Sequence, residues 1–378
     1  MLSTINLFQF GKGNIGGTLI RQVADRAGSL AETTGLSFEY IGICGRNRLI
    51  FNPGGLNKAL SGPGGLDRLL EDGDSRKDYP GAAAMIDRLL GGPGGPGGPG
   101  DPPGNLCVVD TTSAEMTEVH LACLRRGVPV VTANKKPITD RSAAYEEIRR
   151  LGRADRMRYW YETTAGAGLP IVSTVRELVD TGDEVTRIAG CLSGTLGYIC
   201  SQLDHGRTFS EIVREAKELG YTEPDPRDDL NGMDVARKAL ILAREIGYRL
   251  ELDDLEIEGM VSDALLDAPS VDAFMAMLTG EDAAYAQRVE SGGDRGQVLR
   301  YVATVGDGTC RVGLENVDRE SPLGSLAGPD NMVVCTTKRY RDNPLIVRGP
   351  GAGPEVTAGG LFGDLIKAAR ALPGSDHP

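Results

Sequence analysis

The sequence predicts an α/β protein in which a Rossmann-type, doubly wound parallel sheet is joined to an α+β domain. Short apolar strands alternate with helices up to about residue 155, and longer strands follow from residue 156. Strand–helix alternation is typical of a parallel sheet, whereas grouped strands indicate an α+β arrangement. We therefore expect one domain over residues 1–155 and 350–378 and a second over residues 156–349.

In the first domain the pattern predicts strands at 5–10, 38–44, 106–110 and 128–132, a helix from the turn after residue 10 to about residue 27, and a helix at 111–126. In the second domain it predicts strands at 185–191, 298–305, 311–317 and 331–338, and helices near 170–180, 195–204, 209–219, 234–246 and 271–279. We expect this second sheet to be mixed or antiparallel, with helices on one face. A final helix to about residue 372 should pack back on the first domain.

The segment at residues 91–104 consists almost entirely of glycine and proline. Such a segment has no apolar side chains to bury. We expect a surface loop without a catalytic role.

Charge and composition exclude several classes of partner. The 378 residues include 41 basic and 53 acidic ones, which gives a net charge of −12. This balance argues against nucleic acid or an anionic membrane as a partner. No run of about 18 apolar residues is present and no signal peptide is recognisable, so we expect a cytoplasmic protein.

The cysteines and histidines narrow the possible chemistry. The seven cysteines are scattered and never form a C-x-x-C pair, which predicts reduced thiols in the core. Of the three histidines, His377 lies in the C-terminal tail, and His120 and His205 are expected to be structural. Acid–base chemistry is therefore expected to depend on Lys, Asp, Glu or Tyr.

A glycine-rich turn predicts a dinucleotide site. The first strand leads into G-x-G-x-x-G, with Gly11 for the tight turn, Gly13 for the approach of a pyrophosphate, and Gly16 for close packing of helix and strand. The phosphates would lie at the helix N-terminus. Thr112 and Lys135 follow later strands of the same sheet, at the carboxyl edge where ligands bind.

The end of the second strand bears on the choice between NAD and NADP. An NAD site usually has an acidic residue there, about 20 residues beyond the glycines, to bind the ribose 2′-hydroxyl. This sequence has Arg46 and Arg48 instead, at a longer interval. Arginines can hold a 2′-phosphate, so NADP is the expected cofactor, with NAD as the alternative. Both arginines could equally be ordinary solvated surface residues.

An acidic stretch at residues 219–238 contains the candidate catalytic groups. Asn231 is a plausible N-cap for a helix on which Asp234 and Lys238 lie four residues apart, on one face. The simpler interpretation is a surface salt bridge worth a few tenths of a kcal/mol. Glu223, in the preceding loop, suits recognition of a substrate ammonium group.

Several of these segments resemble homoserine dehydrogenases, over almost the whole chain. The matching stretches are 10–16, 131–137, 161–170, 193–195, 223–238 and 349–358. The resemblance implies NAD(P)-dependent interconversion of L-aspartate 4-semialdehyde and L-homoserine, in the biosynthesis of threonine, methionine and isoleucine. It also implies a homodimer, with pairing into a tetramer as the alternative, built through the region of strand 331–338.

The resemblance also implies roles for individual residues. Lys238 is the acid–base group, Lys135 is a second active-site lysine, and Glu223 and Asp234 bind substrate. The resemblance gives Gly13, Asn14, Ile15, Thr112, Lys135 and Gly353 as residues that line the cofactor site. The glycine motif and the end of the second strand add Gly11, Gly16, Arg46 and Arg48. A monovalent cation, typically sodium, is held by Glu162 and the carbonyls of Ala165, Ala167 and Leu169.

The residues themselves are consistent with this chemistry. A lysine can stabilise the alkoxide formed by hydride attack on an aldehyde and can supply its proton. Lys135 and Lys238 could tune each other toward working pH. Two alternatives remain, a related dehydrogenase for another amino acid and a dinucleotide-binding sensor without turnover. Because the chain ends after its last helix, we do not expect threonine feedback through an appended regulatory domain.

Overall fold

The computed structural model describes residues 3–46, 48–62, 64–71, 81–90, 105–153 and 157–372. The chain divides into two compact units, residues 1–168 with 353–378 and residues 169–352. The glycine- and proline-rich segment 91–104, predicted to be a surface loop, lies outside the described residues. Among those described, no helix is both long enough and apolar enough to cross a bilayer.

The first unit is built on a six-stranded sheet in the order β3-β2-β1-β4-β5-β6. All neighbouring strands are parallel except β2 and β3, and this strand order is that of dinucleotide-binding folds. The strands are β1 (Ser3–Phe10), β2 (Leu36–Cys44), β3 (Leu49–Phe51), β4 (Leu106–Asp110), β5 (Val130–Thr132) and β6 (Tyr159–Trp160).

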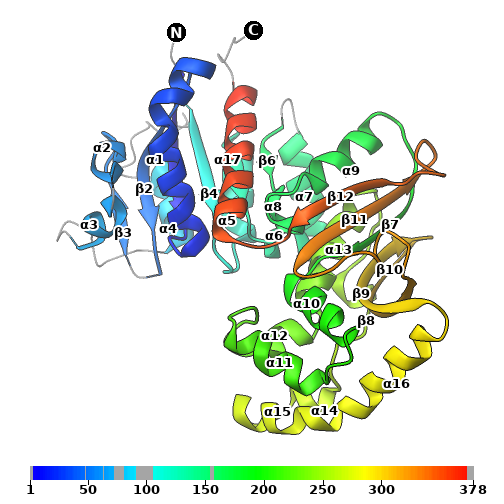
Figure 1. Ribbon diagram of the computed structural model, residues 1–378. Helices are drawn as coiled ribbons and strands as arrows, with labels where there is room; N and C mark the ends of the chain where they lie inside the picture. The colour runs from blue at the N-terminus through cyan, green and yellow to red at the C-terminus, as the bar shows by residue number, and fades with distance from the viewer. Residues whose placement is uncertain are drawn as a thin grey trace. The chain divides into compact units, whose positions relative to one another are not determined.

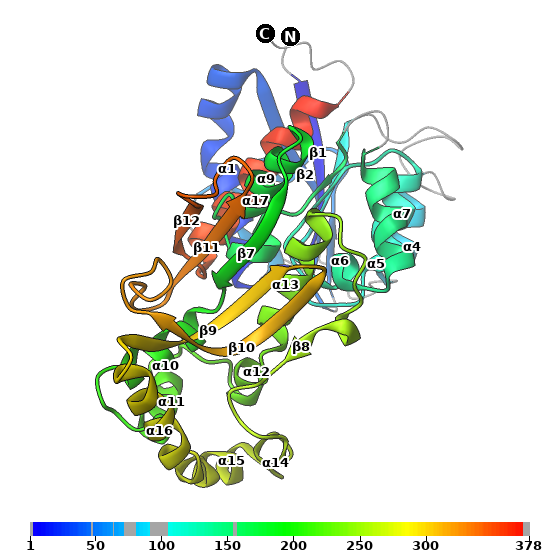
Figure 2. The same cartoon turned by 90° about the vertical axis from the view of Figure 1, so that its right-hand side faces the viewer.

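Helices cover both faces of this sheet. The helices are α1 (Asn14–Thr34), α2 (Asn57–Leu60), α3 (Gly65–Glu71), α4 (Ala82–Leu89), α5 (Thr117–Arg125), α6 (Lys136–Thr139), α7 (Ser142–Arg153), α8 (Thr163–Gly166) and α17 (Pro354–Ala371). Figures 1 and 2 show α1 and α17 on one face, with α4, α5 and α7 on the other.

The C-terminal helix α17 completes the core of the first unit, as predicted. Leu361 and Leu365 are fully buried and belong to one apolar cluster with Leu7 of β1 and Leu19 of α1. The cluster lies between sheet and helices, so α1 and the turn before it rest on a rigid base.

The second unit contains a separate six-stranded sheet in the order β12-β11-β7-β9-β10-β8. It is mixed, as predicted: β8 runs parallel to β10 and the other pairs are antiparallel. Figure 2 shows α9 and α13 on the same face of this sheet. The strands are β7 (Val185–Cys191), β8 (Glu256–Ile257), β9 (Gln297–Gly306), β10 (Thr309–Asp318), β11 (Asp330–Thr337) and β12 (Leu345–Pro350).

The remaining elements of the second unit are mostly helices. They are α9 (Ile171–Asp180), α10 (Gly194–Leu203), α11 (Phe209–Glu218), α12 (Arg227–Leu230), α13 (Met233–Glu245), α14 (Asp263–Leu266), α15 (Val271–Met277) and α16 (Asp282–Gly293), with 3-10 turns at Leu252–Asp254 and Leu278–Gly280. All seven cysteines of the chain are buried and free, as predicted.

Several predicted boundaries were wrong. Residues 157–168 belong to the first unit, because β6 pairs with β5 and extends the first sheet. Helix α1 continues to Thr34 rather than ending near residue 27, and α5 begins at Thr117 rather than at residue 111. The pattern also missed β12 and α16, because neither segment has a distinctive apolar periodicity.

Candidate active site

The glycine turn after β1 has the geometry that its motif predicts. Gly11 adopts a φ of +93°, which favours glycine. A Cβ atom on Gly16 would lie 2.4 Å from the carbonyl oxygen of Gly11 and 2.5 Å from Thr111 Oγ1, so only glycine fits. At Gly13, just before α1, a Cβ atom would meet nothing within 4 Å. The start of α1 therefore offers open space where an anion could approach its backbone N–H groups.

A buried polar pair that the sequence did not reveal supports this turn. The side chain of Gln9 is fully buried, and its Nε2 donates to the carbonyl oxygens of Gly11 at 2.8 Å and Gly16 at 3.0 Å. The Tyr40 hydroxyl donates to Gln9 Oε1 at 2.9 Å. Burial raises the pKa of Tyr40, which keeps that hydroxyl protonated. The only signal in the sequence was a glutamine inside an otherwise apolar strand.

Two cavities flank the start of α1. The larger has a volume of about 710 Å³, and its walls include Gly11, Gly13, Arg46 and Thr112. The smaller, of about 400 Å³, includes Gly13, Asn14 and Pro354. Pockets for small molecules and cofactors typically measure about 300–1,000 Å³. The structure thus brings four predicted cofactor residues to one cavity and adds Asn14 beside it.

Lys12 lies on the walls of both cavities, although the sequence did not single it out. Its side chain runs across Gly45, where a Cβ atom would lie 2.9 Å from Lys12 Cε. A basic residue at the start of a long helix adds to the positive potential there. The signal that could have found it is a lysine between the first two glycines of the motif.

The other predicted cofactor residues lie elsewhere. Arg48 is exposed and is not among the residues on the larger cavity's wall; its carbonyl oxygen accepts from the Gly45 N–H. Ile15 packs against the apolar core. Gly353 has a φ of +122° and is the N-cap of α17, directly before Pro354.

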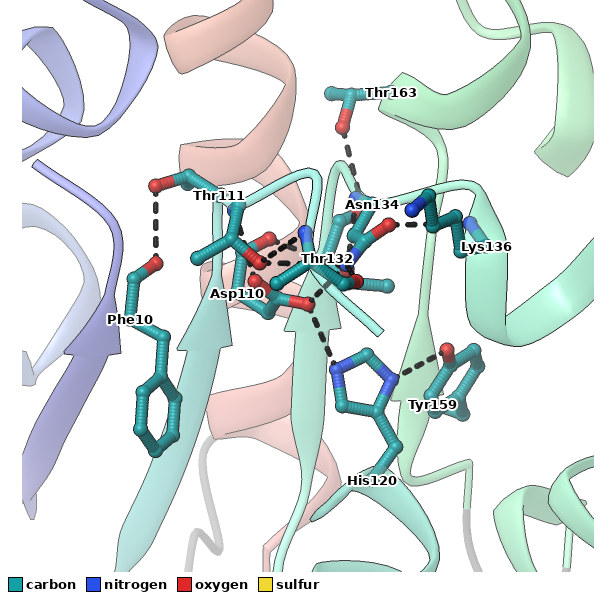
Figure 3. A network of polar contacts seen from close by, with 11 residues as sticks. Phe10, Asp110, Thr111, His120, Thr132, Asn134, Lys136, Tyr159 and Thr163 are labelled. Atoms are coloured by element: carbon teal, nitrogen blue, oxygen red, sulfur yellow. Dashed lines mark hydrogen bonds and ion pairs between the residues drawn. The ribbon is translucent and has the colours of Figure 1, made fainter. Parts of the chain in front are cut away.

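Lys135 follows β5, between Asn134 and Lys136, and Figure 3 shows those two neighbours in a network of polar contacts. Its carbonyl oxygen accepts from the N–H groups of Ile138 and Thr139, which starts the short helix α6. The neighbouring Asn134 is buried and donates to Asp110 at the end of β4. His120 also bonds to Asp110. Its predicted structural role stays a prediction.

The predicted ion pair between Asp234 and Lys238 is formed in the second unit. Lys238 is buried on α13, and its Nζ lies 2.8 Å from Asp234 Oδ2. It also donates to the carbonyl oxygen of Leu192 at 2.6 Å. Only 11% of the Lys238 side chain is exposed, compared with 49% for Asp234. The simple surface salt bridge considered from the sequence is therefore wrong, because the lysine is enclosed.

The predicted helix cap was misplaced by one residue. The N-cap of α13 is Gly232, in the left-handed region with a φ of +75°. Asn231 ends the preceding short helix α12, and its Oδ1 accepts from the N–H of Met233 at 2.8 Å.

Asp229 contacts the loop of Glu223, and the sequence did not single it out. Its Oδ2 accepts from the backbone N–H of Glu223 at 2.8 Å, and its Oδ1 accepts from Thr195 Oγ1 at 3.4 Å. Burial, and to a lesser extent the charges of Glu223 and Asp234, raise the pKa of this carboxyl. It was hard to single out among the other acidic residues of its loop.

The residues predicted to hold a cation lie around α8. The Glu162 carboxylate is buried, and its Oε2 lies 3.9 Å from Lys367 Nζ. Ala165 is fully buried within α8, and Ala167 has a φ of +52°, which is unusual for alanine. Leu169 begins the second unit. Lys135 belongs to the first unit and Lys238 to the second.

Two family models together match most of the chain. The model of homoserine dehydrogenase matches residues 170–366, and that of the homoserine dehydrogenase NAD-binding domain matches residues 11–162. The chain belongs to the homoserine dehydrogenase family. Its Rossmann-like first unit and α/β second unit are those of this family, as predicted.

Individual relatives agree with this assignment. Homoserine dehydrogenase of Emericella nidulans is 43% identical over 283 residues, which cover 71% of this chain and 77% of that protein. Bifunctional aspartokinase/homoserine dehydrogenase 1, chloroplastic, of Zea mays is 39% identical over 373 residues, or 98% of this chain. The chain spans only 39% of the length of that maize protein.

Solved structures share the fold. A protein of unknown function from Candida auris has a TM-score of 0.85 at 30% identity, covering 98% of this chain and 99% of that one. A hyperthermophilic archaeal homoserine dehydrogenase in complex with NADPH has a TM-score of 0.73 at 25% identity, with the same coverage of the two chains.

Proposed function

We propose that this chain catalyses the reversible NAD(P)-dependent interconversion of L-aspartate 4-semialdehyde and L-homoserine. Family membership supports the reaction, and the environment of Lys238 is the observation that carries it. An ammonium group has three N–H donors. Two are directed to Asp234 Oδ2 at 2.8 Å and the Leu192 carbonyl at 2.6 Å, which leaves the third for a substrate oxygen.

Lys238 is proposed as the acid–base group. When bound, the nicotinamide supplies or accepts the hydride. Reduction of the aldehyde leaves negative charge on its oxygen, and a fixed ammonium group both stabilises that charge and donates the proton. Asp234 and the Leu192 carbonyl hold the lysine on α13, so little reorganisation is needed during the reaction.

Glu223 and Asp229 are proposed to bind the α-ammonium group of the substrate. The two residues are linked by the bond from the Glu223 N–H to Asp229 Oδ2. The raised pKa of the Asp229 carboxyl means that nearby positive charge does not offset the cost of burying its negative charge. A bound ammonium group would supply it, which gives a physical reason for selecting an amino acid.

We propose that the first unit binds NADP. Gly13 leaves the start of α1 open, and Arg46 and Lys12 add positive charge to the cavity walls. We propose that Gly11, Gly13, Asn14, Thr112, Lys135 and Gly353 surround the cofactor and that Arg46 binds its 2′-phosphate, with NAD as the alternative. The NADPH complex of the archaeal relative supports this cofactor.

We also propose that a monovalent cation, typically sodium, binds at Glu162. The predicted ligands are all oxygen atoms, the type that hard cations prefer. The buried Glu162 carboxylate and the strained turn at Ala167 fit such a site, with further carbonyls from Ala165 and Leu169.

The test is the absorbance of the reduced nicotinamide during incubation with L-homoserine and NADP. Reduction of NADP with L-homoserine, and not with a panel of other amino acids, would support the proposal. Turnover of a different amino acid would instead identify a related dehydrogenase. Binding of NADPH without any turnover would identify a dinucleotide-binding protein.

A further inference from the structure

The carboxylate of Asp110 is the centre of a buried network at the end of β4 (Figure 3). Its side chain is fully buried. Oδ1 accepts from the backbone N–H of Thr112 at 2.8 Å, and Oδ2 accepts from Asn134 Nδ2 at 2.9 Å. His120 Nε2 lies 3.0 Å from the same Oδ2. A buried carboxylate is costly unless such donors surround it, so these partners hold it in one orientation.

His120 bridges Asp110 and Tyr159. A carboxylate only accepts hydrogen bonds, so Nε2 of His120 donates to Asp110 Oδ2. Its Nδ1 lies 2.9 Å from the Tyr159 hydroxyl, and in a neutral imidazole it accepts from that hydroxyl. Burial, with a smaller contribution from the charge of Asp110, raises the pKa of Tyr159 well above its usual range, so the hydroxyl has a proton to donate.

The side chain of Asn134 links Asp110 to the loop after β5 by hydrogen bonds. Its backbone N–H donates to Thr132 Oγ1 at 2.9 Å, and its Nδ2 also donates to the carbonyl oxygen of Ala114 at 2.9 Å. Its Oδ1 accepts from the N–H of Lys136 at 3.1 Å. The residues on both sides of Lys135 are therefore fixed by one side chain.

We propose that Asp110 is a positioning residue, whose carboxylate places Thr112 and, through Asn134, the backbone of Lys135, and that His120 holds this carboxylate for that purpose. The inference rests on the proposed function, because Thr112 and Lys135 are residues of the proposed dehydrogenase site. Neither Asp110 nor His120 needs to touch a ligand. The competing explanation is that the network only stabilises the fold.

Four variants separate the two explanations. Asp110→Asn puts an N–H₂ group against the donors of His120 and Asn134. His120→Leu removes the donor to Asp110, whereas His120→Gln keeps an N–H near the position of Nε2. Tyr159→Phe is the matched control, since it removes one buried hydrogen bond of the same network but leaves the contact between His120 and Asp110.

For each variant we would measure kcat with L-homoserine, NADPH affinity by nicotinamide fluorescence, and the melting temperature. Misplacing a catalytic group by about 1 Å can cost roughly 10²-fold. We expect Asp110→Asn and His120→Leu to lose about 10- to 100-fold in kcat and to bind NADPH more weakly. His120→Gln and Tyr159→Phe should stay within a few-fold of the parent, even if their melting temperatures fall.

Loss of activity in His120→Gln equal to that in His120→Leu would overturn the inference, as would activity that follows melting temperature across all variants. If Asp110→Asn does not fold, the two His120 variants still decide between positioning and fold stabilisation alone. Failure of the proposed function is seen separately, as parent protein that binds NADPH without oxidising homoserine. NADPH affinity alone then decides: weaker binding in His120→Leu than in His120→Gln supports positioning, and equal binding overturns it.

Discussion

Lys238 is the residue on which the proposed chemistry depends most directly. Its ammonium group is buried and held by Asp234 and the Leu192 carbonyl. Loss of an acid–base group usually costs about 10²- to 10⁴-fold, so Lys238→Ala should lower kcat by roughly 10²-fold or more while NADPH binding persists. Asp234→Asn should slow turnover as well, because it removes a partner that fixes the lysine.

The matched control is Lys338→Ala, which removes an exposed lysine of the same unit that pairs with Glu184 at 2.5 Å. That variant should keep the parent rate. Near-normal kcat in a folded Lys238→Ala protein would contradict the assignment of the acid–base group.

In the proposed function, Arg46 decides the preference for NADP over NAD. It lies on the wall of the larger cavity, whereas Arg48 does not. A hydrogen bond to a charged group contributes about 1.5–3 kcal/mol, so Arg46→Ala should weaken NADP binding about 10-fold or more and leave NAD nearly unchanged. Arg26→Ala, at an exposed position on α1, is the control. Equal weakening of both cofactors would make Arg46 a structural residue.

At the scale of single elements, α17 carries a buried carboxyl that makes stability depend on pH. Asp364 is 1% exposed, and it accepts from the Glu162 N–H at 2.9 Å and from Lys367 Nζ at 3.1 Å. Burial raises its pKa in the folded state despite Lys367. The folded protein therefore binds the proton more tightly than the unfolded chain, and stability falls as pH rises from about 4 toward the raised value.

Asp364→Asn removes this ionisation. We expect the melting temperature of the parent minus that of the variant to fall as pH rises above about 4, where an ordinary aspartate begins to ionise. For Asp25→Asn, on the exposed side of α1, this difference should stay constant. A difference for Asp364→Asn that stays constant or rises with pH would contradict the argument.

At the scale of the whole molecule, the second sheet bears on assembly. The predicted interface strand β11 is not an edge, because it pairs with both β7 and β12. The two edge strands are β8 and β12, and on β12 Ile346 is 44% exposed. An exposed edge strand with an apolar side chain favours pairing with another chain. The predicted homodimer thus remains a prediction, with β12 as its proposed contact.

Light scattering at micromolar concentration should therefore give at least twice the single-chain mass of 40.1 kDa. Ile346→Lys should shift the mass toward one chain, since a charge on an edge strand opposes pairing. A mass near 40.1 kDa for active parent enzyme would rule the dimer out. The cytoplasmic location also remains a prediction.

Local sequence patterns were enough to determine the individual elements that bear the site. The glycine spacing predicted the turn at Gly11 and Gly16, because its backbone angles and close packing admit no side chain. The four-residue spacing of Asp234 and Lys238 predicted their ion pair, because residues four apart share a helix face. Both features depend on neighbours in the chain.

Only the tertiary structure decided the features that join distant segments. It placed β6 in the first sheet, buried Lys238 against the Leu192 carbonyl, and brought His120, Asn134 and Tyr159 around Asp110. It also placed Arg46, but not Arg48, on the wall of the larger cavity, and it showed that Gln9 supports the glycine turn. Burial and long-range hydrogen bonding depend on which strands become neighbours, and no local periodicity encodes that information.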